Sequence, residues 1–140
     1  WNYIKKNFVS YIQNKSFGGY YLPTRFQYVI LRDYFNRNKK LFSLPQGEPI
    51  FSKTCIRLRT IISKLKKYDN LVLLSIYVLP DNKILRKEII KNLIKKKIKT
   101  HFIFENKIAK NEKNYNDILR DYKLSKILEK TKNIKVFKWY

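Results

Sequence analysis

Short apolar runs alternate along the chain with segments whose apolar residues have helical spacing. The longest run, NLVLLSIYVLP at 70–80, is rich in β-branched and aromatic residues, and it predicts a central strand buried on both faces. Weaker segments of the same kind predict four more strands, at 7–13, 40–45, 99–104 and 134–139.

Four segments between or beside these strands predict amphipathic helices. The first is expected to start at Pro23 and Thr24, the second to be capped by Ser52, and the third to be capped by Asp81 or Asn82. Their apolar positions are, in chain order, Phe26, Val29, Ile30 and Tyr34; Leu58, Ile61, Ile62 and Leu65; Ile89, Ile90, Leu93 and Ile94; and Tyr115, Ile118, Leu119 and Tyr122. Because strands alternate with helices, we expect one α/β domain over residues 1–140, a three-layer flavodoxin-like or Rossmann-like fold. Its parallel sheet would have about five strands in the order 2-1-3-4-5.

Ligands of open α/β sheets bind outside the carboxyl ends of the strands, where the strand order reverses. In the expected order this point lies between the first and third strands. The loop after the first strand holds two of the chain's three glycines, and its backbone N–H groups could hold an anion ahead of the first helix. The spacing matches neither a dinucleotide-binding nor a P-loop motif, so a plain strand–helix turn remains the alternative. The candidate ligand-binding residues of this loop are Asn14, Lys15, Ser16, Gly18 and Gly19.

Other candidates follow the later strands. Ser75 and Tyr77, two apart on the predicted central strand, would line the same crevice, although a hydrogen-bonded core serine is the alternative for Ser75. Glu48 and Glu105 are the candidate catalytic carboxylates for acid–base chemistry, with solvated loop carboxylates as the alternative. His101 lies roughly 13 Å from Glu105 along an extended strand, so the two cannot form a dyad and His101 is interpreted as structural.

The formal net charge of +22 would attract a polyanion. Lysine outnumbers arginine 25 to 7, which is also the residue usage that an AT-rich genome imposes, so both explanations stay open. The lysine clusters fall near the predicted helix C-termini, where cations complement the helix dipole, and we expect them to share the rim opposite the crevice. These clusters are Lys39–Lys40, Lys66–Lys67, Lys95–Lys96–Lys97 and Lys130–Lys132.

Cys55 is the only cysteine and His101 the only histidine. One chain therefore cannot form a disulfide framework or a cysteine- or histidine-based zinc site, and no metal or cofactor is expected. No run of about 20 apolar residues predicts a membrane span, and the opening WNYIKKNFVSYI lacks the apolar centre of a signal peptide. A cytoplasmic location is expected, and the sequence leaves homo-oligomerisation open.

Several motifs in order resemble the sporadically distributed carbohydrate-cluster proteins. They are YIQNKSFGGYYLP at 11–23, Gln27, ILRDY at 30–34, SIYVLPDNKILRKEI at 75–89 and HFIFEN at 101–106. That family is named for gene neighbourhoods that build surface sugars, so the resemblance implies a setting in carbohydrate biosynthesis rather than a reaction. The matching positions are Ser16, Gly18, Gly19, Gln27, Arg32, Asp33, Ser75, Pro80, His101 and Glu105. Two positions depart from the pattern: an expected arginine near Asn14–Lys15 is missing, and Leu74 replaces an aromatic residue.

A looser resemblance connects Tyr11, Arg57, Arg59 and Arg86 with the catalytic domain of serine recombinases. In that domain a characteristic arginine precedes the nucleophilic serine, and an Asp-Arg pair follows the third strand. Both features are missing here, so this resemblance implies architecture and not activity. We therefore expect a protein that binds or acts on an activated sugar or sugar precursor at the carboxyl edge of its sheet. The alternative is a basic module that binds RNA or DNA through the lysine-rich rim.

Overall fold

A computed structural model of the chain describes residues 8–13, 16–17, 20–40, 45–47, 55–80 and 82–134. These residues form an α/β fold with four α-helices and an open, mostly parallel mixed sheet. The strand order is β4-β1-β5-β6-β7. The strands of this sheet are β1 (Phe8–Ile12), β4 (Gln46–Gly47), β5 (Asn70–Leu73), β6 (Lys99–Phe102) and β7 (Lys107–Ala109).

The first four strands confirm the predicted order. β1 lies between β4 and β5 and is parallel to both, with Tyr11 level with Gln46 on one side and Leu73 on the other. β5 and β6 are also parallel. The chain therefore moves from β1 outward to β4 and then crosses back to β5 on the other side of β1, so the switch point lies between β1 and β5.

The strand beside β6 is not the one that the sequence predicted there. β7 pairs antiparallel with β6 through a tight turn in which Asn106 has φ 53°, a left-handed conformation that asparagine tolerates. Residues 135–140 of the strand predicted at 134–139 lie outside the described part of the chain, and Ile134 ends a helix.

Three further boundaries differ from the sequence prediction. The central strand ends at Leu73, not Pro80, and a 3₁₀ turn, η1 (Ile76–Val78), follows it. The second strand pairs at Gln46–Gly47, just after the segment predicted at 40–45. Pro45 has no N–H for the ladder, and residues 41–44 lie outside the described part. The glycine-containing loop forms a small antiparallel hairpin of β2 (Ser16–Phe17) and β3 (Tyr20–Tyr21).

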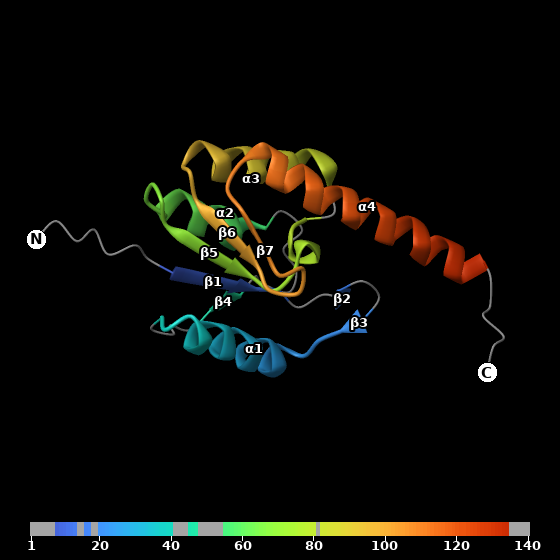
Figure 1. The fold of residues 1–140 in the computed structure, drawn as a ribbon, viewed down its shortest axis with the longest axis horizontal. Coiled ribbons are helices and arrows are strands. Elements are labelled where there is room, and N and C mark those ends of the chain that lie inside the picture. The colour runs from blue at the N-terminus through green and yellow to red at the C-terminus, as the bar shows by residue number, and fades with distance from the viewer. Residues whose placement is uncertain are drawn as a thin grey trace, which may run out of the picture.

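Helices cover both faces of the sheet (Figure 1). α1 (Thr24–Arg37) lies on one side, and α2 (Ile56–Lys64), α3 (Lys83–Lys95) and α4 (Glu112–Ile134) lie on the other. Right-handed crossovers require this division, because the connections before and after β4 run across the sheet in opposite directions. Asn82 caps α3 as predicted, its Oδ1 accepting from the N–H groups of Ile84 and Leu85. Ser52 lies outside the described residues, and α2 begins after Cys55.

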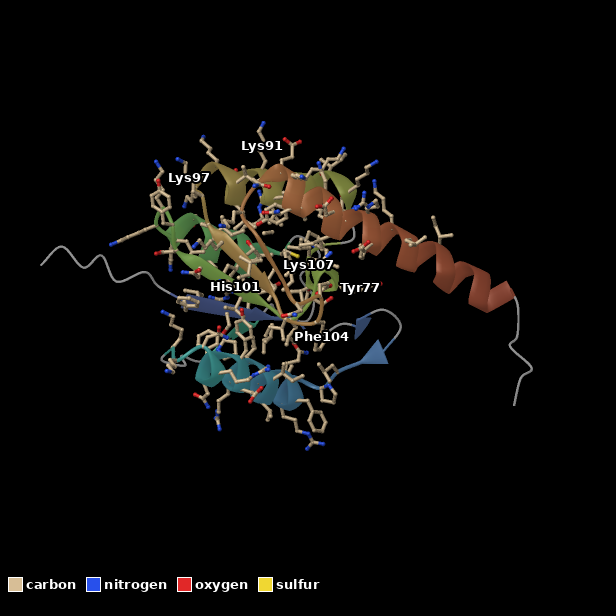
Figure 2. The ribbon with its side chains drawn as sticks, viewed as in Figure 1. Tyr77, Lys91, Lys97, His101, Phe104 and Lys107 are labelled. Atoms are coloured by element: carbon tan, nitrogen blue, oxygen red, sulfur yellow. The ribbon has the colours of Figure 1, made fainter. Side chains whose placement is uncertain are left out.

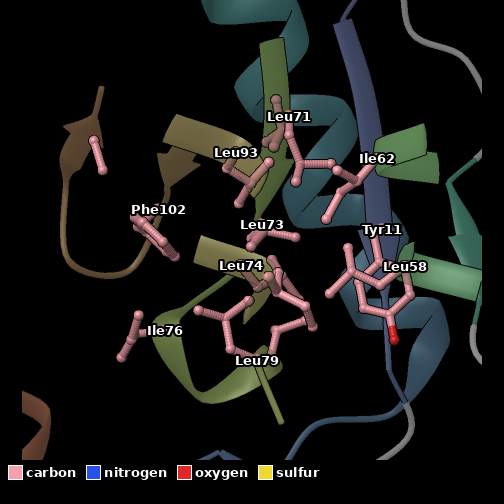
Figure 3. Close-up of a cluster of buried hydrophobic side chains, with 14 of the residues drawn as sticks. Tyr11, Leu58, Ile62, Leu71, Leu73, Leu74, Ile76, Leu79, Leu93 and Phe102 are labelled. Carbon is pink, nitrogen blue, oxygen red and sulfur yellow. The ribbon is translucent and has the colours of Figure 1, made fainter. Parts of the chain in front are cut away.

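Buried apolar side chains pack on both faces of the sheet, with Leu31 and Phe35 of α1 on one face and a larger cluster against the three-helix layer on the other (Figure 3). Leu71 and Leu73 of β5 and Tyr11 of β1 are fully buried, and Leu58 and Leu93 cover them from α2 and α3. Tyr115, Ile118 and Tyr122 bury one side of α4, as their spacing predicted. The rest of α4 extends past the carboxyl end of the sheet (Figure 1).

Candidate functional site

Ser75 and Glu105 meet at the carboxyl edge of the sheet. The Ser75 hydroxyl donates to Glu105 Oε1 at 2.7 Å, and the backbone N–H of Ile76 donates to the same oxygen at 2.9 Å. Ser75 Oγ in turn accepts from the backbone N–H of Tyr77 at 3.3 Å. These side-chain bonds compete with a strand ladder, which explains why β5 ends before Ser75. They also fix one carboxylate oxygen in a single position.

Gln13 reaches the same edge from β1. Tyr11 and Leu73 are register partners on the adjacent strands β1 and β5. Gln13 lies two positions after Tyr11, and Ser75 lies two positions after Leu73. Adjacent strands lie about 4.8 Å apart, so Gln13 and the Ser75–Glu105 pair lie at the same edge of the sheet.

Gln27 of α1 lies beside the end of β1 and is fully buried. Its Nε2 donates to the carbonyls of Gln13, at 3.2 Å, and Leu22, at 2.9 Å. The amide therefore ties the start of α1 to the end of β1. Gln27 stood out in the sequence only through the resemblance, and Gln13 was missed, because neither residue type signals a site on its own.

Three buried acceptor atoms in this region have no hydrogen-bond partner within the described residues. They are Glu105 Oε2, Gln13 Oε1 and Gln27 Oε1. Buried polar atoms are nearly always paired in folded proteins, so these oxygens would accept from a further donor. We name the group formed by Gln13, Gln27, Ser75 and Glu105 the edge cluster. It offers acceptors to a ligand that carries O–H or N–H groups.

Of the other sequence candidates, the structure describes Tyr77 and Ser16. The ring of Tyr77 packs against Tyr122 of α4, with centroids 4.9 Å apart, so Tyr77 and Ser75 do not share a strand face as predicted. Figure 2 shows Tyr77 and Phe104 at the same end of the sheet and His101 nearer its other end. Ser16 lies in β2, which is close to η1. The remaining candidates, Asn14, Lys15, Gly18, Gly19 and Glu48, lie outside the described residues.

The hairpin changes one part of the anion-binding prediction. β3, Leu22 and Pro23 separate the glycine pair from α1, which begins at Thr24 as predicted. The N–H groups of the helix N-terminus are therefore not those of the glycine turn, and the dipole argument does not carry over to this loop.

His101 belongs to a separate buried chain of hydrogen bonds on the α1 side. Its Nδ1 lies 2.7 Å from the Tyr34 hydroxyl and its Nε2 lies 3.0 Å from Asn70 Oδ1. Because Asn70 Oδ1 only accepts, Nε2 carries the proton and Nδ1 accepts from Tyr34. Burial, aided by the charge of Lys99, lowers the pKa of His101 to about 4, and burial raises the pKa of Tyr34. This arrangement is consistent with the structural interpretation of His101.

At three of the four helices, the lysine clusters lie on the rim of the sheet opposite the edge cluster. Lys39–Lys40, Lys66–Lys67 and Lys95–Lys97 follow or end α1, α2 and α3, as predicted. The placement predicted for Lys130 and Lys132 was wrong, because α4 continues past them and points away from that rim (Figure 1).

Comparisons with known proteins do not place the chain in a family. No protein-family model, no curated protein and no solved structure matches it. Within the described residues, no three histidine, cysteine, aspartate or glutamate side chains are grouped to hold a metal ion. None of the helices in that part of the chain combines the length and the apolar character needed to cross a membrane.

Proposed function

We propose that the chain is a cytoplasmic protein of surface-carbohydrate biosynthesis that binds an activated sugar or sugar precursor at the edge cluster. One observation carries the proposal: Glu105 is held through Oε1 by Ser75 and Ile76, while its Oε2 is buried without a partner among the described residues. A carboxylate that is held in one position, with its second oxygen available to accept, suits a donor hydroxyl of a sugar. Hydrogen bonds to charged acceptors are stronger than hydrogen bonds to neutral ones.

The position and chemistry of the cluster support the same ligand class. The cluster lies at the strand-order switch point, where α/β sheets bind ligands. The order of the four parallel strands supports the flavodoxin-like three-layer fold that we propose for the chain. The spare oxygens of Gln13 and Gln27 add two neutral acceptors. A polyol supplies several donors at once, whereas the dianion of a phosphate monoester supplies none. The phosphate of an activated sugar would instead be held by the loop at 14–19.

Glu105 is also the acid–base candidate, because its spare oxygen would accept a proton from the hydroxyl that it binds. Glu105→Gln tests the site directly. The amide oxygen can still accept from Ser75 and Ile76, so the loop keeps its bonds, but the NH₂ group replaces an acceptor with a donor where the ligand needs an acceptor. Glu112→Gln, at the exposed start of α4, makes the same charge change far from the cluster and is the matched control.

Thermal unfolding with UDP-glucose, UDP-N-acetylglucosamine and glucose 1-phosphate, at low and high salt, is the experiment. A ligand at about 100 times its Kd raises the free energy of unfolding by about 2.7 kcal/mol, which corresponds to a rise in Tm of roughly 8 °C. We expect one sugar class to stabilise the wild type and Glu112→Gln equally and to leave Glu105→Gln unchanged. The proposal is overturned if no sugar stabilises the chain, or if Glu105→Gln responds like the wild type.

A further inference from the structure

A groove about 570 Å³ in volume runs between α2 and α3, far from the edge cluster. Its polar lining is basic, with Arg59 and Lys67 on the α2 side and Lys95 and Lys96 on the α3 side. Lys96 is committed to the fold, because its Nζ donates to the carbonyls of Ile62, Ser63 and Leu65 at 2.6, 3.0 and 3.1 Å. The remaining lining residues are Ile62, Ser63 and Asn92.

An exposed tyrosine stands beside the groove between two lysines. Tyr68 is 46 % exposed, and its ring centroid lies 5.6 Å from Lys67 Nζ and 5.7 Å from Lys97 Nζ. The ion pairs among the described residues do not include Lys67, Lys95 or Lys97. This surface therefore combines the ring of Tyr68 with three lysines that have no carboxylate partner in the described part of the chain. Figure 2 shows Lys97 at the end of the helical layer.

Two residues of this surface have left-handed backbone. Tyr68 and Lys97 have φ 71° and 55°. Lys39 and Cys55, which do not line the groove, have similar values of 54° and 53°. The conformation therefore belongs to several connections of the fold and is not special to the groove.

We propose that Lys67, Tyr68, Lys95 and Lys97, here named the groove face, bind single-stranded nucleic acid without sequence specificity. The three lysines contact phosphates, and the Tyr68 ring stacks on a base, the combination that binds single strands. Lysine acts as a point charge without the bidentate geometry of arginine, and phosphate contacts carry no sequence information. This function is independent of sugar binding and uses none of the same residues.

Fluorescence anisotropy with a labelled oligo(dT) and a labelled oligo(rU) 12-mer tests the charges. The triple variant Lys67→Gln/Lys95→Gln/Lys97→Gln is compared with Lys110→Gln/Lys113→Gln/Lys123→Gln, which removes the same charge from exposed positions on and before α4. We expect the wild type to lose affinity as salt rises. Each lost phosphate contact lowers the slope of log K against log salt by about 0.7. The groove variant should therefore have a slope smaller by about 2, and the control variant an unchanged slope.

Two variants of Tyr68 test stacking without a change of charge. Tyr68→Leu keeps apolar bulk and loses the π face, so we expect affinity to fall about tenfold, whereas Tyr68→Phe keeps the wild-type affinity. The proposal is overturned by absence of oligonucleotide binding at 50 mM salt, by equal losses in the two triple variants, or by equal affinity of the two Tyr68 variants. Binding to phosphatidylserine vesicles with no binding to either oligonucleotide would also overturn it. None of these results depends on Glu105, so failure of one proposal is distinguishable from failure of the other.

Discussion

Ser75 and Glu105 are 30 positions apart in the chain, and the Ser75 hydroxyl donates to Glu105 Oε1 at 2.7 Å. The bond joins the loop after β5 to the turn after β6, at the edge where these parallel strands end. It leaves the second carboxylate oxygen buried without a partner among the described residues. The pair therefore serves two roles: it terminates the central strand, and it presents an oriented acceptor.

The Ser75–Glu105 bond should appear as a coupling energy between the two side chains. We expect Ser75→Ala and Glu105→Ala each to lower the free energy of unfolding, and the double variant to lose less than their sum by about 1–2 kcal/mol. Urea denaturation of the four proteins measures this coupling. Additive losses, within about 0.5 kcal/mol, would mean that the bond does not contribute to stability.

His101 should make the chain less stable in mild acid. Its folded pKa of about 4 lies below the ordinary value of 6.5, so the unfolded chain binds a proton more readily between these pH values. The contribution is complete above about pH 6.5 and is lost as the pH falls toward 4, by about 2–3 kcal/mol. Urea denaturation from pH 4 to 8 measures it. His101→Gln, which cannot titrate, should flatten this part of the pH profile, and an unchanged profile would contradict the assignment.

Lys96 should stabilise the C-terminal end of α2, and its hydrogen bonds should contribute more than its charge. Its ammonium donates to three carbonyls around the last turn of that helix. Lys96→Met keeps the aliphatic stem and removes these bonds, so we expect a loss of about 1–3 kcal/mol. Lys95→Met changes the neighbouring exposed lysine and should stay within about 0.5 kcal/mol of the wild type. Equal losses in chemical denaturation would contradict the capping role.

Lys97→Gly should raise stability while it weakens oligonucleotide binding. Glycine adopts the left-handed conformation at this position without the steric cost that lysine incurs, so we expect a gain of about 0.5–1 kcal/mol. The same substitution at Lys91, within α3, should cost about 1 kcal/mol. Thermal unfolding measures both effects. A loss of stability in Lys97→Gly would show that the lysine is held there by contacts of its own.

Gln27→Leu should loosen the junction of β1 and α1. The buried amide donates to the carbonyls of Gln13 and Leu22, and leucine of similar size would leave both acceptors without this donor. We expect a loss of about 2–3 kcal/mol, measured by urea denaturation. Arg25→Leu, on the exposed first turn of the same helix, is the control and should change little.

Local sequence patterns predicted the structure correctly where a single residue type determines it. Pro23 and Thr24 set the start of α1, and Asn82 caps α3, because capping depends on residues within one turn. The apolar spacing of α3 and α4 identified their buried faces in the same way. The boundaries that failed depended on distant partners. The run at 70–80 is almost entirely apolar. Its pattern therefore could not indicate that Ser75 and Ile76 would donate hydrogen bonds to Glu105 and that the strand would end at Leu73.

The sequence by itself determined an α/β fold, the order of the first four strands and the rim on which most of the lysines gather. Helical and strand periodicity, crossover handedness and helix ends are local or topological properties, and they can be read along the chain. Tertiary structure alone decided which polar residues meet. Ser75 meets Glu105, and Gln27 meets the carbonyl of Gln13, because three strand ends and one helix share an edge. Lys67 and Lys97 flank Tyr68 because two helix ends share a rim. Contacts of this kind depend on the packing of distant segments, for which no single stretch of sequence carries a signal.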